Sequence, residues 1–388
     1  NRTIKELSSA LKKTSHNLII SSHLFPSSEE LDELMTIVNL PLPDQKELKN
    51  LIKKIAINTN SNLNEKDLNE LSLASSGLTE IKVKQVTAKA LAQRGKISKE
   101  DIKEILEEKK QVIARSEILE FFEAKSSQDD IGGLNVLKVW LNQRYRAFSK
   151  EARDYGLPIP KGVLLVGAQG TGKSLTAKSI SKSWSMPLLR LDVGRLFSSL
   201  VGSSEARTRE TILRAEAMSP CILWIDEIDK GFGGDARSDG GTSQRVLASL
   251  LTWMAEKESA VFVIATANAI DKLPAELLRK GRFDEIFFLD LPNSEERLSI
   301  LDLHLKKRRP GYSFPLSTII DRTEGYSGAE LEQAVIEGMH ISFSENRELM
   351  EKDLIKAVSE LVPLSRTAKE QIDLLKEWSS TGRARFAS

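Results

Sequence analysis

The stretch Gly167-Ala-Gln-Gly-Thr-Gly-Lys-Ser174 decides the fold of the chain, because it matches the pattern G-x-x-x-x-G-K-[ST] in full. It follows the apolar run Val163–Val166, which has the composition of a buried strand, and a helical pattern begins near Ser174. In such a unit the glycine-rich turn directs backbone N–H groups inward, where they bind phosphate at a helix N-terminus. A plain glycine turn with a solvated lysine is the alternative, and the strand–helix context disfavours it. The sequence therefore predicts a phosphate-binding loop.

A second motif, Cys221-Ile-Leu-Trp-Ile-Asp-Glu227, places a pair of carboxylates after another apolar strand. On its own, such a pair is usually a cap or a solvated turn. After a phosphate-binding loop, Lys173 would bind the β- and γ-phosphates, and the Ser174 hydroxyl would ligate Mg²⁺. Asp226 would hold the same ion through water, and Glu227 would orient or deprotonate the attacking water. Hydrolysis of a nucleoside triphosphate is the function that the two motifs favour.

Three polar residues after the second motif have both a catalytic and a structural interpretation. Asn268 follows the apolar strand Val261–Ala265, where its amide would position water near the γ-phosphate; an asparagine that turns the chain is the alternative. Arg279 and Arg282 precede a further strand, and they would either form surface ion pairs or reach the γ-phosphate of a neighbouring subunit. Asp229, by contrast, is expected at the surface.

Near-continuous apolar strands alternate with helical patterns from about Ile131 onward, which is typical of a parallel sheet covered on both faces. After Pro292 we expect only helices. We therefore predict an α/β fold: a linker over residues 116–130, an αβα core over 131–305, and a helical lid with a C-terminal helix over 306–388. The expected strands are Val163–Val166, Leu188–Leu191, Cys221–Ile225, Val261–Ala265 and Ile286–Leu289.

The first 115 residues are mostly helical in pattern, with a capping-box spacing at Asp44 and Glu47 and a further cap at Ser98. They also look like a weakened copy of the later chain, because short landmarks recur in one order at offsets of 248 to 252 residues. Capping sequences can resemble one another by chance, but the constant spacing favours a repeat. We expect residues 1–115 to be the back half of a degenerate module whose front half lies upstream of Asn1. The landmark pairs are Leu42-Pro43 with Leu291-Pro292, Gly77-Leu-Thr with Gly325-Tyr-Ser, and Ser98–Ile102 with Met350–Leu354.

The composition excludes several functional classes. The 388 residues include 56 Lys and Arg against 55 Asp and Glu, without the basic stripe that nucleic-acid binders usually show. The single cysteine, Cys221, excludes an intrachain disulfide framework and a cysteine-rich zinc site, and it fits a reducing intracellular compartment. No apolar run reaches the ~18 residues that span a bilayer. The four histidines do not cluster in sequence, so none is assigned a ligand or catalytic role.

The order of these motifs resembles that of the AAA family of ATPases over about residues 129–362. The resemblance implies an αβα core with a small helical lid, hydrolysis of Mg-ATP, and a homo-oligomeric ring, such as a hexamer, in which each site lies between two subunits. The motifs that carry it are Asp130-Ile-Gly-Gly-Leu134, Gly167–Ser174, Asp226-Glu227, Asn268, Arg279-x-Gly-Arg282-Phe-Asp284 and Gly325-Tyr-Ser-Gly-Ala-Glu-Leu331.

The same resemblance implies a role for each matching residue. Ser174 and Asp226 would hold the metal ion, and Asn268 would be the first sensor. Arg279 and Arg282 match the fingers that act in trans on a neighbouring subunit's ATP. The residues expected to bind the nucleotide are Ile131, Gly132, Gly167, Ala168, Gln169, Gly170, Thr171, Gly172, Lys173, Ser174, Leu175, Gly328 and Ala329.

Further stretches, among them Gly156–Gly162 and Pro220–Lys230, are similar to a divergent AAA group of cyanobacteria and algal plastids, the hypothetical chloroplast reading frame forty-six family. This resemblance extends over the first 115 residues and implies a photosynthetic organism, with the protein in the cyanobacterial cytosol or the plastid stroma. Leu200 stands where many substrate-threading AAA proteins have an aromatic side chain. Because leucine offers a smaller contact, bulk unfolding by threading is disfavoured.

Three functions remain to be weighed. The first is an ATPase that remodels or regulates an unidentified protein partner as a homo-oligomer. The second is a module in which ATP occupancy switches conformation with low turnover. The third is a DNA-acting ATPase, which the near-neutral charge of the chain disfavours. A measured turnover number would separate the first two functions, and salt-dependent DNA binding would support the third. We expect one hydrolytic site per chain, because the first 125 residues contain no phosphate-binding loop.

Overall fold

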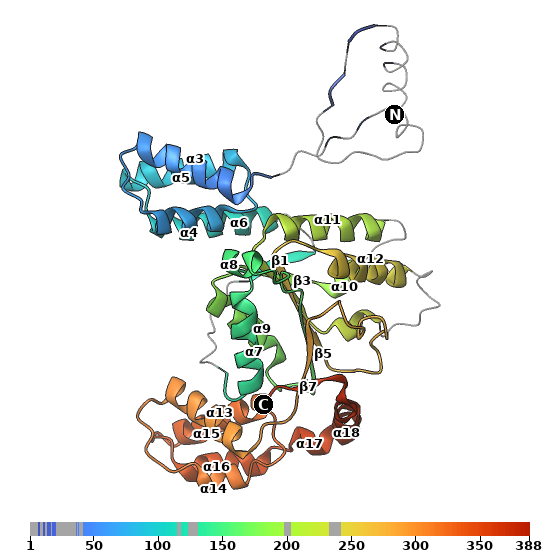
Figure 1. The fold of residues 1–388 in the computed structure, drawn as a ribbon. Helices are drawn as coiled ribbons and strands as arrows, with labels where there is room; N and C mark the ends of the chain where they lie inside the picture. Colours follow the sequence, from blue (N-terminus) through green and yellow to red (C-terminus); the bar gives the residue numbers. More distant parts are fainter. Residues whose placement is uncertain are drawn as a thin grey trace. The chain divides into compact units, whose positions relative to one another are not determined.

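The computed structural model divides the chain into two units, residues 1–42 and 43–388 (Figure 1). All the helices and strands named below lie in the second unit. In the first, the described residues include Thr14, whose backbone N–H donates to the carbonyl of Leu11. Within the described ranges, no helix is long and apolar enough to cross a membrane. The structure describes residues 7, 11, 14–16, 18–20, 36, 38, 42–114, 118–122, 131–197, 203–232 and 242–388.

A seven-stranded sheet with the strand order β1-β3-β4-β5-β2-β6-β7 forms the centre of the second unit. Neighbouring strands are parallel, except that β1 and β3 are antiparallel. The five strands predicted from apolar runs are present as β2 to β6, so the α/β prediction is confirmed. The strands are β1 (Leu119–Phe122), β2 (Gly162–Gly167), β3 (Leu188–Leu191), β4 (Cys221–Ile225), β5 (Val261–Ala267), β6 (Glu285–Leu289) and β7 (Arg385–Phe386).

Helices cover both faces of the sheet, so the central strands are buried on each side (Figure 1). Val163 and Leu165 pack with α7 and α9 on one face, whereas Leu164 and Val166 pack with α10, α11 and α12 on the other. Alternate residues of one strand thus enter different layers, which explains its continuous apolar sequence. The helices here are α7 (Asn135–Arg146), α8 (Lys150–Asp154), α9 (Lys173–Trp184), α10 (Val193–Phe197), α11 (Ser203–Ala217), η3 (Ile228–Phe232) and α12 (Thr242–Glu256).

Strand β1 corrects the linker expected over residues 116–130. Within it, Leu119–Phe122 extends the edge of the sheet and buries Leu119 in the core. Phe122 also packs edge-to-face on Trp224, with 5.7 Å between the ring centroids. The aromatic residues at 121 and 122 were the sequence signal for a strand, because aromatic side chains favour a pleated, half-buried surface.

Helices α13 to α16 form a small lid with a hydrophobic cluster of its own, which includes Leu301, Leu305 and Leu331. Because both Leu301 and Leu305 lie on α13, this helix belongs to the lid. The expected boundary between residues 305 and 306 is therefore wrong, since it would cut α13 in two. The lid helices are α13 (Ser294–Arg308), α14 (Ser317–Asp321), α15 (Gly328–Ser344) and α16 (Glu351–Glu360).

After the lid the chain returns to the core, which corrects the expectation that only helices follow the sheet. Helix α18 buries Leu375 and Trp378 in a core cluster, and β7 pairs in parallel with β6. The N–H of Ala387 donates to the carbonyl of Phe288 at 3.0 Å, and its own carbonyl accepts from the N–H of Leu137 at 3.0 Å. The elements of this segment are α17 (Leu364–Thr367), α18 (Lys369–Trp378), η4 (Ser379–Arg383) and β7.

Helices α3 to α6 form a second small bundle, with Leu48 and Leu71 among its buried residues. The predicted capping box is present at its start. Asp44 Oδ1 accepts from the N–H of Glu47 at 2.7 Å, and Glu47 Oε2 accepts from the N–H of Asp44 at 2.9 Å. The elements are α3 (Gln45–Asn58), α4 (Glu65–Ser75), α5 (Glu80–Arg94), η1 (Lys99–Asp101) and α6 (Ile102–Ala114).

This bundle and the lid each contain an ion pair between a buried aspartate and a partly exposed arginine. Asp101 pairs with Arg94, and Asp353 pairs with Arg347 at 2.6 Å. Each aspartate also accepts from the backbone N–H three residues before it, at 2.8 Å and 2.9 Å. Both are at most 2% exposed, and the offset of 252 residues matches that of the sequence landmarks. A buried carboxylate is costly unless it is well compensated, and in each bundle an arginine and a backbone N–H supply that compensation.

Candidate active site

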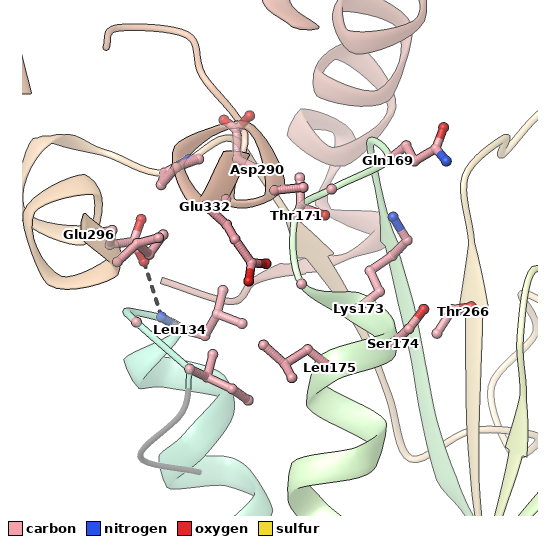
Figure 2. A pocket seen from close by; sticks show the side chains of 18 of the residues that line it. Leu134, Gln169, Thr171, Lys173, Ser174, Leu175, Thr266, Asp290, Glu296 and Glu332 are labelled. Atoms are coloured by element: carbon pink, nitrogen blue, oxygen red, sulfur yellow. Dashed lines mark hydrogen bonds between the residues drawn. The ribbon is translucent and has the colours of Figure 1, made fainter. Parts of the chain in front are cut away.

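A cavity of about 370 Å³ lies at the carboxyl ends of β2, β4 and β5, between the sheet and the lid. Its walls come from the phosphate-binding loop, the strand ends, the segment before α7 and the lid helices α13 and α15 (Figure 2). This volume is in the range of small-ligand sites. The predicted site residues that line it are Ile131, Gly132, Gln169, Gly170, Thr171, Gly172, Lys173, Ser174, Leu175, Asp226, Glu227, Asn268, Gly328 and Ala329.

The loop between β2 and α9 has the backbone that phosphate binding requires. Gly170 and Gly172 have φ values of +81° and +91°, a left-handed region in which a side chain would cause strain. A Cβ atom on Gly170 would also lie 2.8 Å from the hydroxyl of Ser327. Glycine at residue 170 is therefore needed for the turn and for the approach of the lid.

Lys173, at the start of α9, is 6% exposed and lies within the loop (Figure 2). Its Nζ donates to the carbonyls of Gly167 at 2.8 Å and Ala168 at 2.6 Å. Burial lowers the pKa of Lys173 to about 8, although nearby carboxylates, Asp229 first among them, act in the opposite direction. A phosphate group at this position would supply the counter-charge that stabilises the ammonium.

Ser174 and Asp226 are joined by a hydrogen bond of 3.0 Å from the serine hydroxyl to Asp226 Oδ1. Thr266, fully buried on β5, donates to the same carboxylate oxygen at 2.7 Å. The sheet register causes this contact, because Ile225 pairs with Ala265 and the next residues of both strands are neighbours. Hydroxyl and carboxylate oxygens are the ligands that Mg²⁺ prefers, so Ser174 and Asp226 fit this ion. Thr266 was missed in the sequence analysis.

Glu227 has a backbone φ of +49°, which is unusual for a residue other than glycine and common at functional sites. Its N–H donates to the hydroxyl of Thr266 at 2.8 Å, which holds this conformation. Its carboxylate has two partners: Asn268 Nδ2 donates to Oε1 at 3.1 Å, and Lys230 Nζ lies 2.5 Å from Oε2. The structure thus brings the carboxylate and the amide together, as their predicted roles require.

Asp229 is not the surface residue expected from the sequence, because it is only 4% exposed. Its two carboxylate oxygens accept from the backbone N–H groups of Asn268 and Ala269, both at 3.2 Å. The short helix η3 turns the chain back toward β5 and causes this contact. Asp229 therefore holds the backbone from which the Asn268 amide projects.

One end of the cavity is bordered by the segment before α7 and by helix α13 of the lid. Ile131 and Gly132 line it, and a Cβ atom on Gly132 would lie 2.6 Å from Cγ1 of Ile300 on α13. The N–H of Leu134 donates to Glu296 Oε1 at 3.1 Å, the contact drawn in Figure 2. This hydrogen bond and the close approach of Gly132 to Ile300 hold the segment before α7 against the lid.

The lid contributes a histidine that the sequence analysis set aside. His304 on α13 and Glu332 on α15 both line the cavity, and His304 Nδ1 lies 3.5 Å from Glu332 Oε1. Burial lowers the pKa of His304, although the neighbouring Glu332 acts in the opposite direction. The predicted lid residue Ala329 donates its N–H to the carbonyl of Gly170 at 3.2 Å, which ties the lid to the loop.

Four predicted residues do not line the cavity. Gly167 and Ala168 act through the carbonyls that hold Lys173. Arg279 is exposed, and Arg282 is half-buried, with its Nε lacking a hydrogen-bond partner among the described residues. Leu200, the position expected to be aromatic in threading proteins, lies outside the described residues.

The sheet, the phosphate-binding loop, the carboxylates after β4 and the lid over the cavity together define an AAA-class ATPase fold. The family model for the "ATPase family associated with various cellular activities (AAA)" matches residues 163–291. The model for the second domain of SpoVK-like AAA ATPases matches residues 46–116. The chain belongs to the ycf46 family of AAA domain-containing proteins.

The family assignment rests on relatives that match over the whole chain. The "uncharacterized AAA domain-containing protein ycf46" of Pyropia yezoensis is 47% identical over 390 residues, which cover 100% of this chain and 79% of that one. The protein of the same name in Guillardia theta is 46% identical, with 77% of its length covered. The ATP-dependent zinc metalloprotease FtsH of Cyanidium caldarium is 36% identical over 60% of this chain and 39% of its own.

Proposed function

We propose that the protein binds Mg-ATP in this cavity, hydrolyses it, and uses the cycle to remodel or regulate a protein partner. The observation that supports this most directly is the hydrogen-bonded chain Ser174–Asp226–Thr266–Glu227–Asn268. It joins a pair of metal-ligating oxygens to a general base and a water-positioning amide. Because the relatives come from algae, we propose a photosynthetic organism and a place in the plastid stroma or the cyanobacterial cytosol.

The proposed mechanism relies on positioning and electrostatics, because phosphoryl transfer passes through a loose transition state. Lys173 and the loop N–H groups would bind the β- and γ-phosphates. Ser174, and Asp226 through water, would hold Mg²⁺, which neutralises charge on the phosphate oxygens. Glu227 would accept a proton from the attacking water, while the Asn268 amide orients that water.

We further propose that the protein acts as a homo-oligomeric ring, such as a hexamer, in which the site is completed in trans. Arg279 is exposed and Arg282 is half-buried, and neither lines the cavity of its own chain. A guanidinium in this place is free to stabilise charge on a neighbouring subunit's γ-phosphate. The partner that is remodelled would be a protein rather than a nucleic acid, consistent with the near-neutral charge.

Residues 1–115 are proposed to be the back half of a degenerate AAA-like module without a hydrolytic site. The match of residues 46–116 to a SpoVK-like second domain and the recurring aspartate–arginine pair support this. The lid residues Gly328 and Ala329 border the cavity, whereas the corresponding positions of the first bundle are Glu80 and Ile81. These larger side chains would obstruct the close approach of a phosphate-binding loop.

A second candidate function is an ATP-occupancy switch with low turnover. Both carboxylate oxygens of Glu227 are engaged, one by Asn268 and the other by Lys230. A base held in this way would deprotonate water slowly, so that bound ATP would mainly set the conformation. Turnover at saturating ATP separates this candidate from the first.

The test of the proposed function separates binding from chemistry. Lys173→Ala removes the charge that faces the phosphates and should abolish ATP binding. Glu227→Gln keeps the shape but cannot accept a proton, so it should bind ATP and hydrolyse it very slowly. Equilibrium ATP binding and phosphate release would be measured for both, with the exposed Lys272→Ala and Glu258→Gln as controls. If Glu227→Gln hydrolysed ATP at the wild-type rate, Glu227 would not be the general base and the proposed function would be contradicted.

A further inference from the structure

We infer that Gln371, on helix α18 of the C-terminal segment 363–388, is a positioning residue for hydrolysis; this inference rests on the proposed function. Its Nε2 donates to the backbone carbonyl of Asn268 at 3.1 Å. The two residues are 103 positions apart in the chain, so the contact exists only because the segment folds back onto the core after the lid. Gln371 itself does not line the cavity.

The contact is one of three hydrogen bonds that hold Asn268. The backbone N–H of Asn268 donates to Asp229 at 3.2 Å, and the side-chain amide of Asn268 donates to Glu227 Oε1 at 3.1 Å. Gln371 adds the third contact, at the carbonyl. The Asn268 N–H and the Asn268 carbonyl belong to the two peptide groups on either side of its Cα, so both groups are restrained and the side-chain amide keeps its direction toward Glu227. A shift of the peptide would move that amide away from the water it orients.

Two more residues of the segment bond to side chains that line the cavity. Lys376 on α18 forms an ion pair with Asp290 at 3.3 Å, and the hydroxyl of Ser388 lies 2.5 Å from Glu296 Oε1. Asp290 and Glu296 both line the cavity, and both are labelled in Figure 2. The segment thus supports the cavity at three separate points: the strand end of β5, the strand end of β6 and the lid.

The same segment is tied to the lid at its other end. The N–H of Ser365 donates to the carbonyl of Gly325 at 3.4 Å. Gly325 and Tyr326 directly precede the turn at Gly328, which borders the cavity. In Figure 1 the red segment leaves the orange lid at α17 and reaches the sheet again at β7. A lid movement would therefore be transmitted along α17 and α18 to Asn268.

The test compares kcat with ATP affinity. Gln371→Ala should lower kcat by about 3- to 10-fold, the effect of one lost hydrogen bond. Its ATP dissociation constant, measured with Glu227→Gln added to prevent hydrolysis, should stay within about twofold, because no phosphate contact changes. Gln371→Glu has the same shape without the donor and should be at least as slow. Gln371→Lys keeps a donor at this position and should restore most of the rate.

The control is Asp373→Ala, which removes an exposed side chain from the same helix and should leave kcat unchanged. Gln371 is exposed, so its replacement should leave the unfolding midpoint nearly unchanged. Wild-type kcat in Gln371→Ala, or an equal loss of ATP affinity, would overturn the inference while the proposed function stands. Absence of hydrolysis in the wild type would overturn both.

Discussion

The ammonium of Lys230 lies 2.5 Å from Oε2 of Glu227, three residues earlier in the chain. Hydrogen bonding to Glu227 raises the pKa of Lys230, which therefore remains charged at neutral pH. This ion pair occupies the carboxylate oxygen that Asn268 leaves open, so Glu227 has to release the lysine before that oxygen can accept a proton from water. The lysine side chain is 68% exposed, so it can leave without disturbing the core.

Lys230→Ala should therefore raise turnover by about two- to fivefold, the range of an exposed ion pair. ATP affinity should not change, because Lys230 does not line the cavity. Lys230→Arg keeps the charge and should behave like the wild type. Steady-state phosphate release at saturating ATP measures the effect, and equal or lower turnover in Lys230→Ala would show that the ion pair does not restrain Glu227.

ATP affinity should fall as the pH rises through 8. Burial lowers the pKa of Lys173 to about 8 in the free protein, and bound phosphates would raise it again. Binding then takes up a proton above pH 8, so affinity is constant below about pH 7 and decreases at higher pH. At pH 9 the dissociation constant should be about tenfold higher than at pH 7. Lys173→Arg stays charged over this range; its affinity should be independent of pH, whereas a flat profile in the wild type would contradict the prediction.

Arg279→Ala and Arg282→Ala should keep ATP affinity and lose turnover, since an arginine finger contributes about 10³–10⁵ in rate. Mixing Arg279→Ala with Lys173→Ala should restore some activity, because a mixed interface joins one intact loop to one intact finger. Specific activity should also rise with protein concentration as subunits associate. If both arginines only form ion pairs in their own subunit, single substitutions will be nearly neutral and mixing will rescue nothing.

Lys109 on α6 should destabilise the folded chain at neutral pH. It is 1% exposed, and burial lowers its pKa from 10.5 to about 8 although the thiol of Cys221 opposes this. Lys109→Met should raise the free energy of unfolding by about 3 kcal/mol at pH 7. Between pH 8 and 10.5 the unfolded wild type binds a proton that the folded wild type has lost, so the free energy of unfolding of the wild type rises with pH. The advantage of Lys109→Met over the wild type therefore disappears over this range. Denaturant unfolding at pH 7 and 10 measures this.

The neighbouring substitution Lys110→Met serves as the control for Lys109. Lys110 is 43% exposed and pairs with Glu107 at 3.6 Å on the same helix. Its replacement should change the free energy of unfolding by no more than about 0.5 kcal/mol at either pH. A Lys109→Met protein less stable than the wild type at pH 7 would mean that the ammonium has better partners than its burial indicates.

The parts of the site that were predictable from the sequence are those that depend on neighbouring residues. The glycines at 170 and 172 are needed by the local turn, and Asp226 follows its strand directly. The capping box of Asp44 and Glu47 spans a single helical turn and was equally visible. Each of these features is determined by a few consecutive residues, so spacing alone identifies it.

The parts that were missed depend on segments that are distant in the chain. Thr266 contacts Asp226 only through the strand register, and Asp229 is buried only because η3 folds back on β5. His304 reaches the cavity because the lid covers it. Strand β7 has two residues, too few for an apolar pattern to identify. The signal for Thr266 was its place two residues before Asn268 on a strand beside Asp226.

Trp378 gives the C-terminal segment a spectroscopic reporter of its own. Its indole is 9% exposed and packs into the core cluster from helix α18, the helix that also carries Gln371. If α18 leaves the core during the ATP cycle, this indole passes from apolar surroundings into water, and its fluorescence emission moves to longer wavelength. The movement of the segment can then be followed in the unlabelled chain, with Trp378→Phe identifying the contribution of this one indole.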